Sequence, residues 1–322
     1  MSVSQSSFLP APVLCIVLPC YNEEAIITGT LQKLTKLLNV MVENGKISRE
    51  SFLVLVDDGS RDKTWITIEE ARTNSNNVRG LKLSKNYGHQ NAIMAGMFNY
   101  KDESDCIITI DADLQDDETA MEQMIDKYRQ GNEIIYGVRK ARNTDSFFKK
   151  YTAIGFYLLI KKLGVDIIHN HADYRLASKR VIEELEKYKE VNLFLRGIFP
   201  LLGYKHDMVY YDRKERTAGE TKFPFTKMLA FAIQGITSFS VKPLRIITVI
   251  GLFVFIASIL LSGYVIYSWF FLNAVPGWAS IALPTYFIGG VQLLSIGIIG
   301  EYLGKIYQEV KQRPRYNIDK KI

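Results

Sequence analysis

The sequence has few of the features that mark several common classes of protein. It contains three cysteines in 322 residues, Cys15, Cys20 and Cys106, with no CxxC pair, which argues against a disulfide framework and a cysteine zinc site. The first residues include no basic stretch followed by an apolar core, so we expect no signal peptide and a disordered lead-in at residues 1–12. Basic residues form no stripe despite a net charge of +6, and nucleic acid is therefore not an expected partner.

Glycine-rich phosphate loops are also missing. The chain has neither a GxxxxGKS or GxxxxGKT sequence nor GxGxxG after its first apolar run, which argues against a P-loop ATPase and a nicotinamide enzyme. A bound phosphate would then be held by a metal ion and by basic side chains. The candidates are Arg139, after an expected strand at 133–137, and Arg216 and Lys222, in a segment whose glycine and small residues suit a mobile loop.

Charge is absent from one long interval. Between Arg245 and Glu301 there is no Asp, Glu, Lys or Arg. A loop at 273–280 separates two expected membrane helices, 246–272 and 281–304, the second of which continues a few residues past this interval. Each segment is long enough to cross a hydrocarbon core of about 30 Å as a helix. Basic residues flank the pair and the loop has none, so the positive-inside rule places both termini in the cytoplasm. We expect a two-span protein of the inner or plasma membrane, the alternative being a buried core hairpin.

The remaining segments complete the expected domain organisation. Residues 13–222 alternate apolar and charged stretches and are expected to form a cytoplasmic catalytic domain, because free buried thiols suit a reducing compartment. Residues 223–245 mix apolar and polar side chains, and their place directly before an expected span favours an amphipathic helix in the headgroup plane over a helix packed on the domain. Residues 305–322 are expected to be a basic cytoplasmic tail.

The expected catalytic domain alternates short apolar runs with stretches of helical periodicity. This alternation predicts βαβ units, that is, an α/β fold with a mainly parallel sheet and helices on both faces. The expected strands lie at 13–18, 52–56, 78–83 and 106–110, and the expected helices at 23–42, 63–74 and 91–100. Ligands bind beyond the carboxyl ends of such strands, and polar clusters follow three of them, at 19–24, 57–60 and 111–115.

The triplet Asp111-Ala112-Asp113 is the principal candidate for a metal site. Two carboxylates at i and i+2 on an extended chain point the same way, and their oxygens suit Mg²⁺ or Mn²⁺. An ion there would neutralise a diphosphate leaving group. The alternative is that these acids only line a turn or the first turn of a helix.

The other two clusters offer groups for a nucleoside. Tyr21 provides a ring on which a base can stack and Glu23 an acceptor, although the same residues are also typical of a strand-to-helix turn. One of Asp57 and Asp58 can accept from a base N–H or a ribose hydroxyl, while the other caps the next helix.

Taken in order, the elements PCYNEE, VDDGS, DADLQ, GVR and RTAGETK, ahead of two apolar segments, resemble glycosyltransferase family 2. More narrowly, the chain is similar to bacterial polyprenyl-phosphate glycosyltransferases (bactoprenol glucosyltransferases) and, more distantly, to dolichyl-phosphate mannose synthases. The resemblance implies a GT-A type domain that transfers a hexose with inversion to undecaprenyl phosphate at the cytoplasmic membrane face. UDP-glucose is the expected donor and UDP-GlcNAc the alternative.

The resemblance also implies partners and residue roles. It implies a homo-oligomer, with a tetramer as one candidate, and a separate flippase that delivers the lipid-linked sugar for cell-wall or O-antigen glycosylation. The nucleoside would be surrounded by Pro19, Tyr21, Glu23, Val56 and Asp58. The metal and diphosphate would be bordered by Asp111, Ala112, Asp113 and Gln115, with Asp113 and Gln115 as direct ligands of Mg²⁺ or Mn²⁺. The phosphates would be held by Arg139, Arg216 and Lys222.

Asp173, in the sequence HADYR, is a candidate catalytic residue with two open interpretations. One interpretation is a general base, but a phosphate monoester with a second pKa of about 6 is already an anionic nucleophile. The alternative is that Asp173 pairs with Arg175 or positions the acceptor. A processive polysaccharide synthase would carry more spans and a QxxRW motif, which is missing, and a non-catalytic membrane partner would not need the acidic and basic sets.

Overall fold

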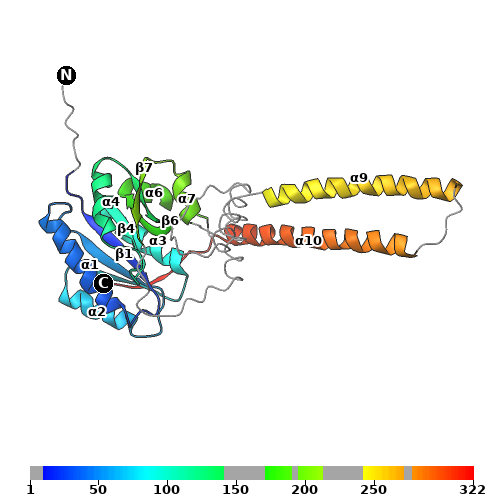
Figure 1. Cartoon of the computed structure of the whole chain (residues 1–322). Helices are drawn as coiled ribbons and strands as arrows, with labels where there is room; N and C mark the ends of the chain where they lie inside the picture. Colours follow the sequence, from blue (N-terminus) through cyan, green and yellow to red (C-terminus); the bar gives the residue numbers. More distant parts are fainter. Residues whose placement is uncertain (1–9, 141–170, 191–194, 213–241, 272–277) are drawn as a thin grey trace, which may run out of the picture. The chain divides into compact units, whose positions relative to one another are not determined.

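The computed structural model describes residues 10–140, 171–190, 195–212, 242–271 and 278–322 (Figure 1). The expected lead-in up to residue 9, Arg216, Lys222, residues 223–241 of the expected interfacial segment and residues 273–277 of the expected inter-span loop lie outside these residues. The chain divides into two compact units. The first, which we call the catalytic unit, contains every described strand, and the second contains α9 and α10.

The described strands form one mixed sheet in the order β7-β5-β6-β4-β1-β2-β3-β8. β1 pairs in parallel with β2 and β4, β2 with β3, and β5 with β7, whereas β6 and β8 run antiparallel to their neighbours. The predicted α/β fold with a mostly parallel sheet is therefore confirmed. The strands are β1 (Leu14–Cys20), β2 (Phe52–Asp57), β3 (Val78–Leu83), β4 (Cys106–Thr109), β5 (Ile134–Arg139), β6 (His171–Ser178), β7 (His206–Tyr211) and β8 (Ile318–Lys321).

Helices cover both faces of this sheet because successive strand residues point to opposite faces. Leu14, Ile16 and Leu18 of β1 share a buried core with apolar residues of α1, α2 and α4. Val17 points the other way, toward α3, where a Cβ on Gly96 would lie 2.4 Å from Val17 Cγ1. The helices of this unit are α1 (Ile27–Glu43), α2 (Thr64–Asn74), α3 (His89–Tyr100), α4 (Ala120–Arg129), α6 (Lys179–Glu186) and α7 (Leu195–Leu201), with a 3-10 turn at Lys101–Glu103.

The three cysteines lie in β1 and β4 and are buried. None of them forms a disulfide, as their odd number and spacing predicted. Burial raises the pKa of each thiol well above its usual value, so all three behave as small apolar core residues.

The second unit contains two long helices, α9 (Lys242–Phe271) and α10 (Trp278–Lys311), which run side by side in opposite directions (Figure 1). Among the described residues, one segment, Phe287–Lys311 of α10, is long and apolar enough to cross a membrane, and α9 contributes a shorter apolar stretch, Leu244–Val254. The structure therefore supplies one candidate span, and the two-span topology stays a prediction.

The end of the chain differs from the basic tail expected at 305–322. Residues up to Lys311 continue α10, and Ile318–Lys321 form β8, which pairs with β3 at the edge of the sheet. The expectation of a tail came from charge alone. An exposed edge strand readily carries charged side chains, so charge does not exclude strand pairing.

Candidate active site

The three predicted polar clusters lie together at the carboxyl ends of the central parallel strands, which we call the strand-end side of the sheet. β1, β2 and β4 are parallel neighbours, so their carboxyl ends lie together. Pro19 pairs in register with Val56, and the amide of Asp58 donates to the carbonyl of Cys20 at 2.9 Å. The carbonyl of Ala112 accepts from Thr30 Oγ1 at 2.7 Å, which fixes the acidic triplet against α1.

Hydrogen bonds between backbone amides and side-chain oxygens join the segments that follow β1 and β2. Asn22 has a positive φ of 56°; its amide donates to Ser60 Oγ at 2.9 Å and its side-chain oxygen accepts from the amide of Arg61 at 2.9 Å. The amide of Glu23 donates to Thr64 Oγ1 at 2.8 Å. The neighbouring Tyr21 is 42% exposed, so its ring is open to a stacking partner.

The two carboxylates after β2 have different partners. Asp57 Oδ1 accepts from the amide of Ser60 at 3.0 Å, which closes a local turn. Asp58 accepts from the amides of Tyr87 at 2.7 Å and Gly88 at 2.9 Å, in the loop before α3. Burial raises the pKa of both carboxyls, and the amide hydrogen bonds oppose this effect. Asp57 therefore shapes the turn, and Asp58 links β2 to a distant loop.

The acidic triplet follows β4, which pairs with β1 in the sheet. Leu114 has a positive φ of 45°, and Asp113 Oδ1 accepts from the amide of Gln115 at 3.2 Å. Desolvation raises the pKa of Asp111, while the nearby His89 favours its charged form. The backbone thus turns sharply just after β4 and keeps Asp111, Asp113 and Gln115 close together.

These residues fit a hard divalent cation. Asp113 and Gln115 offer carboxylate and amide oxygens, the donor type that Mg²⁺ and Mn²⁺ prefer. Within the described part of the chain, no three His, Cys, Asp or Glu side chains converge to form a complete metal cage. An ion bound here would take its other ligands from a diphosphate and from water, which is typical of Mg²⁺ sites in phosphoryl and nucleotide chemistry.

Arg139 is held in place at the end of β5. Its Nε lies 2.8 Å from Asp116 Oδ1 and its Nη2 donates to Asp116 Oδ2 at 3.0 Å. Burial disfavours the charged guanidinium, but Asp116 outweighs burial and raises the pKa of Arg139. A guanidinium has five N–H groups in a fixed planar arrangement. The pairing with Asp116 uses only some of them and fixes the direction in which the remaining N–H groups of Arg139 point.

Asp173 is the centre of a buried ionic cluster. Its Oδ1 accepts from Arg175 Nη2 at 2.6 Å, and its Oδ2 accepts from Arg196 Nη2 at 3.0 Å. Burial acts to raise the pKa of Asp173, but the charges of Arg196 and Arg175 outweigh it and hold the pKa well below its usual range. A carboxylate in this state is a poor proton acceptor. The geometry therefore matches the predicted pairing with Arg175 better than the role of general base.

Two residues of this site were not among the predicted site residues. His89, the first residue of α3, has its Nε2 3.4 Å from Asp111 Oδ1 and 3.7 Å from Asp173 Oδ2. Arg196, on α7, pairs with Asp173, and the adjoining amide of Leu195 donates to Gln90 Oε1 at 3.1 Å. No local spacing marks a single His or Arg, so only the contacts between α3, β6 and α7 show their place.

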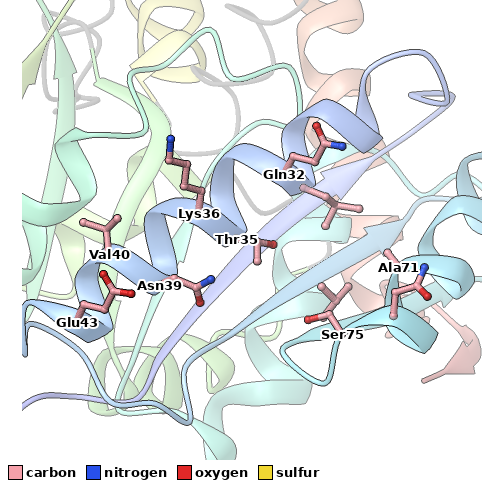
Figure 2. Close-up of a pocket in the computed structure, with 11 residues that line it drawn as sticks. Gln32, Thr35, Lys36, Asn39, Val40, Glu43, Ala71 and Ser75 are labelled. Carbon is pink, nitrogen blue, oxygen red and sulfur yellow. The ribbon is translucent and has the colours of Figure 1, made fainter.

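A separate surface groove of about 540 Å³ lies between α1 and α2 (Figure 2). Polar residues such as Gln32 and Asn39 line it together with apolar ones such as Val40 and Ala71. None of the predicted site residues is among those that line the groove. We therefore place the candidate site at the strand ends.

Comparison with known proteins defines the class. The family model described as "Glycosyl transferase family 2" matches residues 15–186, and the chain belongs to this family. The match covers β1 to α6, and thus each of the polar clusters at the strand ends. The protein is a glycosyltransferase with a GT-A-like α/β domain.

Curated relatives extend the similarity over nearly the whole chain. The chain is 50% identical over 308 residues to "Uncharacterized glycosyltransferase YkoT" of Bacillus subtilis (strain 168), covering 96% of this chain and 91% of that protein. It is 38% identical over 312 residues to "SfII prophage-derived bactoprenol glucosyl transferase" of Shigella flexneri, covering 95% and 97%. It is 37% identical over 310 residues to "Prophage bactoprenol glucosyl transferase homolog" of Escherichia coli (strain K12), covering 95% and 98%.

Proposed function

We propose that the protein transfers a hexose from a nucleotide-sugar, with UDP-glucose as the first candidate, to undecaprenyl phosphate at the cytoplasmic face of the inner or plasma membrane. The proposal rests on the acidic site at the strand ends of a family 2 glycosyltransferase. The chain that carries this site aligns along 95% of its length with a bactoprenol glucosyl transferase. The alignment includes the apolar helices, which a transferase with a soluble acceptor does not need.

The strand-end residues divide between the parts of the donor. Tyr21 and Asp58, with the neighbouring Pro19, Glu23 and Val56, would surround the nucleoside. Asp113 and Gln115 would hold Mg²⁺ or Mn²⁺, which when bound would neutralise charge that develops on the departing diphosphate. Phosphate oxygens would also be contacted by Arg139, whose orientation is set by Asp116, and by Arg216 and Lys222.

The reaction needs no protein base. An ionised oxygen of the lipid phosphate forms a bond to the anomeric carbon on the face opposite the leaving group. The bond from that carbon to the diphosphate oxygen breaks, and the nucleoside diphosphate leaves with the electron pair. The acceptor is already anionic at neutral pH, and Asp173 is held ionised by two arginines. We therefore assign Asp173 to positioning: it fixes Arg196 and His89 beside Asp111.

The membrane placement is part of the proposal. Phe287–Lys311 of α10 provides one apolar segment of sufficient length, and we propose that α9 forms a second span beside it, with residues 223–245 lying at the headgroups. The uncharged turn between the helices would then face outward. Both termini and the catalytic unit would face the cytoplasm, where nucleotide-sugars are available.

The product would be a lipid-linked sugar, and its chemistry implies two further proteins. A separate flippase must move the sugar headgroup across the bilayer, and an external transferase must use it on a cell-wall polymer or O-antigen. We propose that the protein itself acts as a homo-oligomer, with a tetramer as one candidate, an assembly that cross-linking in membranes would reveal.

A donor screen tests the proposal. Purified protein in detergent, with undecaprenyl phosphate and Mg²⁺ or Mn²⁺, would be incubated with a panel of radiolabelled nucleotide-sugars that includes UDP-glucose and UDP-GlcNAc. We expect an organic-extractable product from UDP-glucose. A product from UDP-GlcNAc alone would keep the reaction and change the sugar. No product from any donor would favour a non-catalytic membrane partner that retains the fold.

A further inference from the structure

The segment that follows α10, residues 312–322, belongs to the catalytic unit, and we call it the return segment. Its far end completes the sheet edge: the amide of Gly80 donates to the carbonyl of Ile322 at 3.0 Å, and the amide of Ile322 donates back at 2.9 Å. A Cβ on Gly80 would lie 2.8 Å from the side chains of both Ile322 and Ile68. Glycine thus leaves room for Ile322 to pack on the sheet, and Lys320 Nζ adds an ion pair with Glu69 Oε1 at 2.6 Å.

The near end of the return segment contacts the loop between β3 and α3, residues 84–88. The carbonyl of Asn317 accepts from the amide of Ser84 at 3.0 Å. Asn317 Nδ2 donates to the hydroxyl of Tyr87 at 3.0 Å, and this hydroxyl also lies 3.0 Å from Ser84 Oγ. Two groups therefore hold the end of the Tyr87 ring, and one of them comes from the return segment.

The other side of the same loop holds the carboxylate of Asp58. The amides of Tyr87 and Gly88 donate to its two oxygens. Gly59, next to Asp58, has a φ of +68°, and a Cβ there would lie 2.4 Å from the carbonyl carbon of Lys85. The loop is thus packed directly on the turn that follows β2, and a shift of the loop would move Asp58.

We infer that the return segment positions the donor site, with Asn317 as a positioning residue that acts on Asp58 through Tyr87. This inference rests on the proposed function, because Asp58 matters for the reaction only as a contact of the nucleoside. Five residues, 312–316, separate the last residue of α10 from Asn317. The helix proposed to enter the membrane is therefore continuous with the segment that orders the donor site.

Two measurements on the full-length protein in detergent test this inference. Hydrogen exchange of peptides that contain the amides of Tyr87 and Gly88 needs no donor. Steady-state transfer from UDP-glucose to undecaprenyl phosphate gives separate KM values for donor and acceptor. The variants are Asn317→Ala, which removes the hydrogen bond, and Asn317→Asp, in which the Tyr87 hydroxyl can donate to the new carboxylate. Lys320→Gln is the matched control, because it removes a contact at the far end of the return segment.

In Asn317→Ala we expect the two amides to exchange roughly threefold to tenfold faster and the donor KM to rise by a similar factor, the range for one lost hydrogen bond. The turnover number and the acceptor KM should stay at their wild-type values, Asn317→Asp should restore donor KM, and Lys320→Gln should match wild type. Unchanged exchange in Asn317→Ala overturns the inference, as does a fall in turnover with donor KM unchanged. Absence of transfer by the wild-type protein would instead contradict the proposed function, while the exchange result would still decide the inference.

Discussion

Replacement of Asp173 by Asn is the most informative single change in the ionic cluster. The substitution keeps the shape of the side chain and removes the charge that Arg175 and Arg196 share. The side chain of Arg175 is 2% exposed and that of Arg196 is 31% exposed, so at least one guanidinium would stay buried without its carboxylate. Breaking a buried pair in this way typically costs about 3–5 kcal/mol, and the retained amide oxygen of Asn places our expectation near the lower value.

This loss is large enough to measure as a melting temperature. For a domain of about 200 residues, roughly 3 kcal/mol corresponds to a fall of about 6–12 °C. Trp65, buried in the core of the catalytic unit, provides a fluorescence signal for unfolding. Asp207→Asn is the matched control, since Asp207 is 41% exposed in its pair with Lys127 and exposed pairs contribute about 0–1 kcal/mol. Equal melting temperatures for the two variants would refute the buried-cluster interpretation.

The pH dependence of the same variant has a definite sign. Because the folded-state pKa of Asp173 is lowered from an unfolded value of about 3.9, its stabilisation is complete above that value and is lost as the pH falls toward the folded pKa. The difference in stability between wild type and Asp173→Asn should stay constant from about pH 6 to 8 and shrink below about pH 4. A wild-type activity profile with a limb near neutral pH that disappears in Asp173→Asn would support a general base instead.

Three further substitutions probe other residues of the candidate site. His89→Gln removes the ring that faces two carboxylates and should lower kcat/KM by roughly tenfold or more through misplacement of the reacting groups, measured by product formation at low donor concentration. Gly59→Ala should lower the free energy of unfolding by about 1–3 kcal/mol and weaken donor binding, whereas Gly45→Ala, where no atom lies within 4 Å of the added Cβ, should leave donor binding unchanged. Arg139→Lys keeps the charge but loses the bidentate pairing with Asp116, and we expect a donor KM about tenfold higher. An unchanged donor KM would show that donor binding does not need the guanidinium of Arg139.

Much of the catalytic fold could be predicted because its signals are local. The strand at 78–83 has the predicted bounds, and the other predicted strands and helices differ from the observed ones by a few residues at their ends. Parallel β1, β2 and β4 read as apolar runs, since both of their faces are buried. The polar clusters after β1, β2 and β4 predicted a candidate site at the carboxyl ends of these strands, which the structure places side by side.

The rest of the sheet depends on contacts that no local pattern shows. β6 has Asp173 and Arg175 in its interior, and a strand with buried charges does not look like a core strand until their pairing is known. β8, with the sequence IDKK, is exposed and mostly charged. Its place is fixed by pairing with the backbone of β3 and by ion pairs such as Lys320–Glu69, whose partners lie far away in the sequence.

The site divides in the same way. Asp58, Asp111 and Asp113 were predicted as site residues because they follow apolar runs, and their roles stay predictions. His89 and Arg196 were not predicted, since each gains its position from a carboxylate far away in the sequence. For the same reason the sequence left the role of Asp173 open between base and ion pair.

The central claim is that the acidic strand-end site supports sugar transfer to a polyprenyl phosphate. Its most direct test is the formation of organic-extractable product from UDP-glucose and undecaprenyl phosphate by the wild-type protein and by Asp113→Asn, each with and without a chelator. We expect product from the wild type, its loss with chelator, and a fall of at least about a hundredfold in Asp113→Asn, as for removal of a main electrostatic contact to the leaving group. Full transfer by Asp113→Asn, or no transfer by the wild type with any nucleotide-sugar, would contradict the claim.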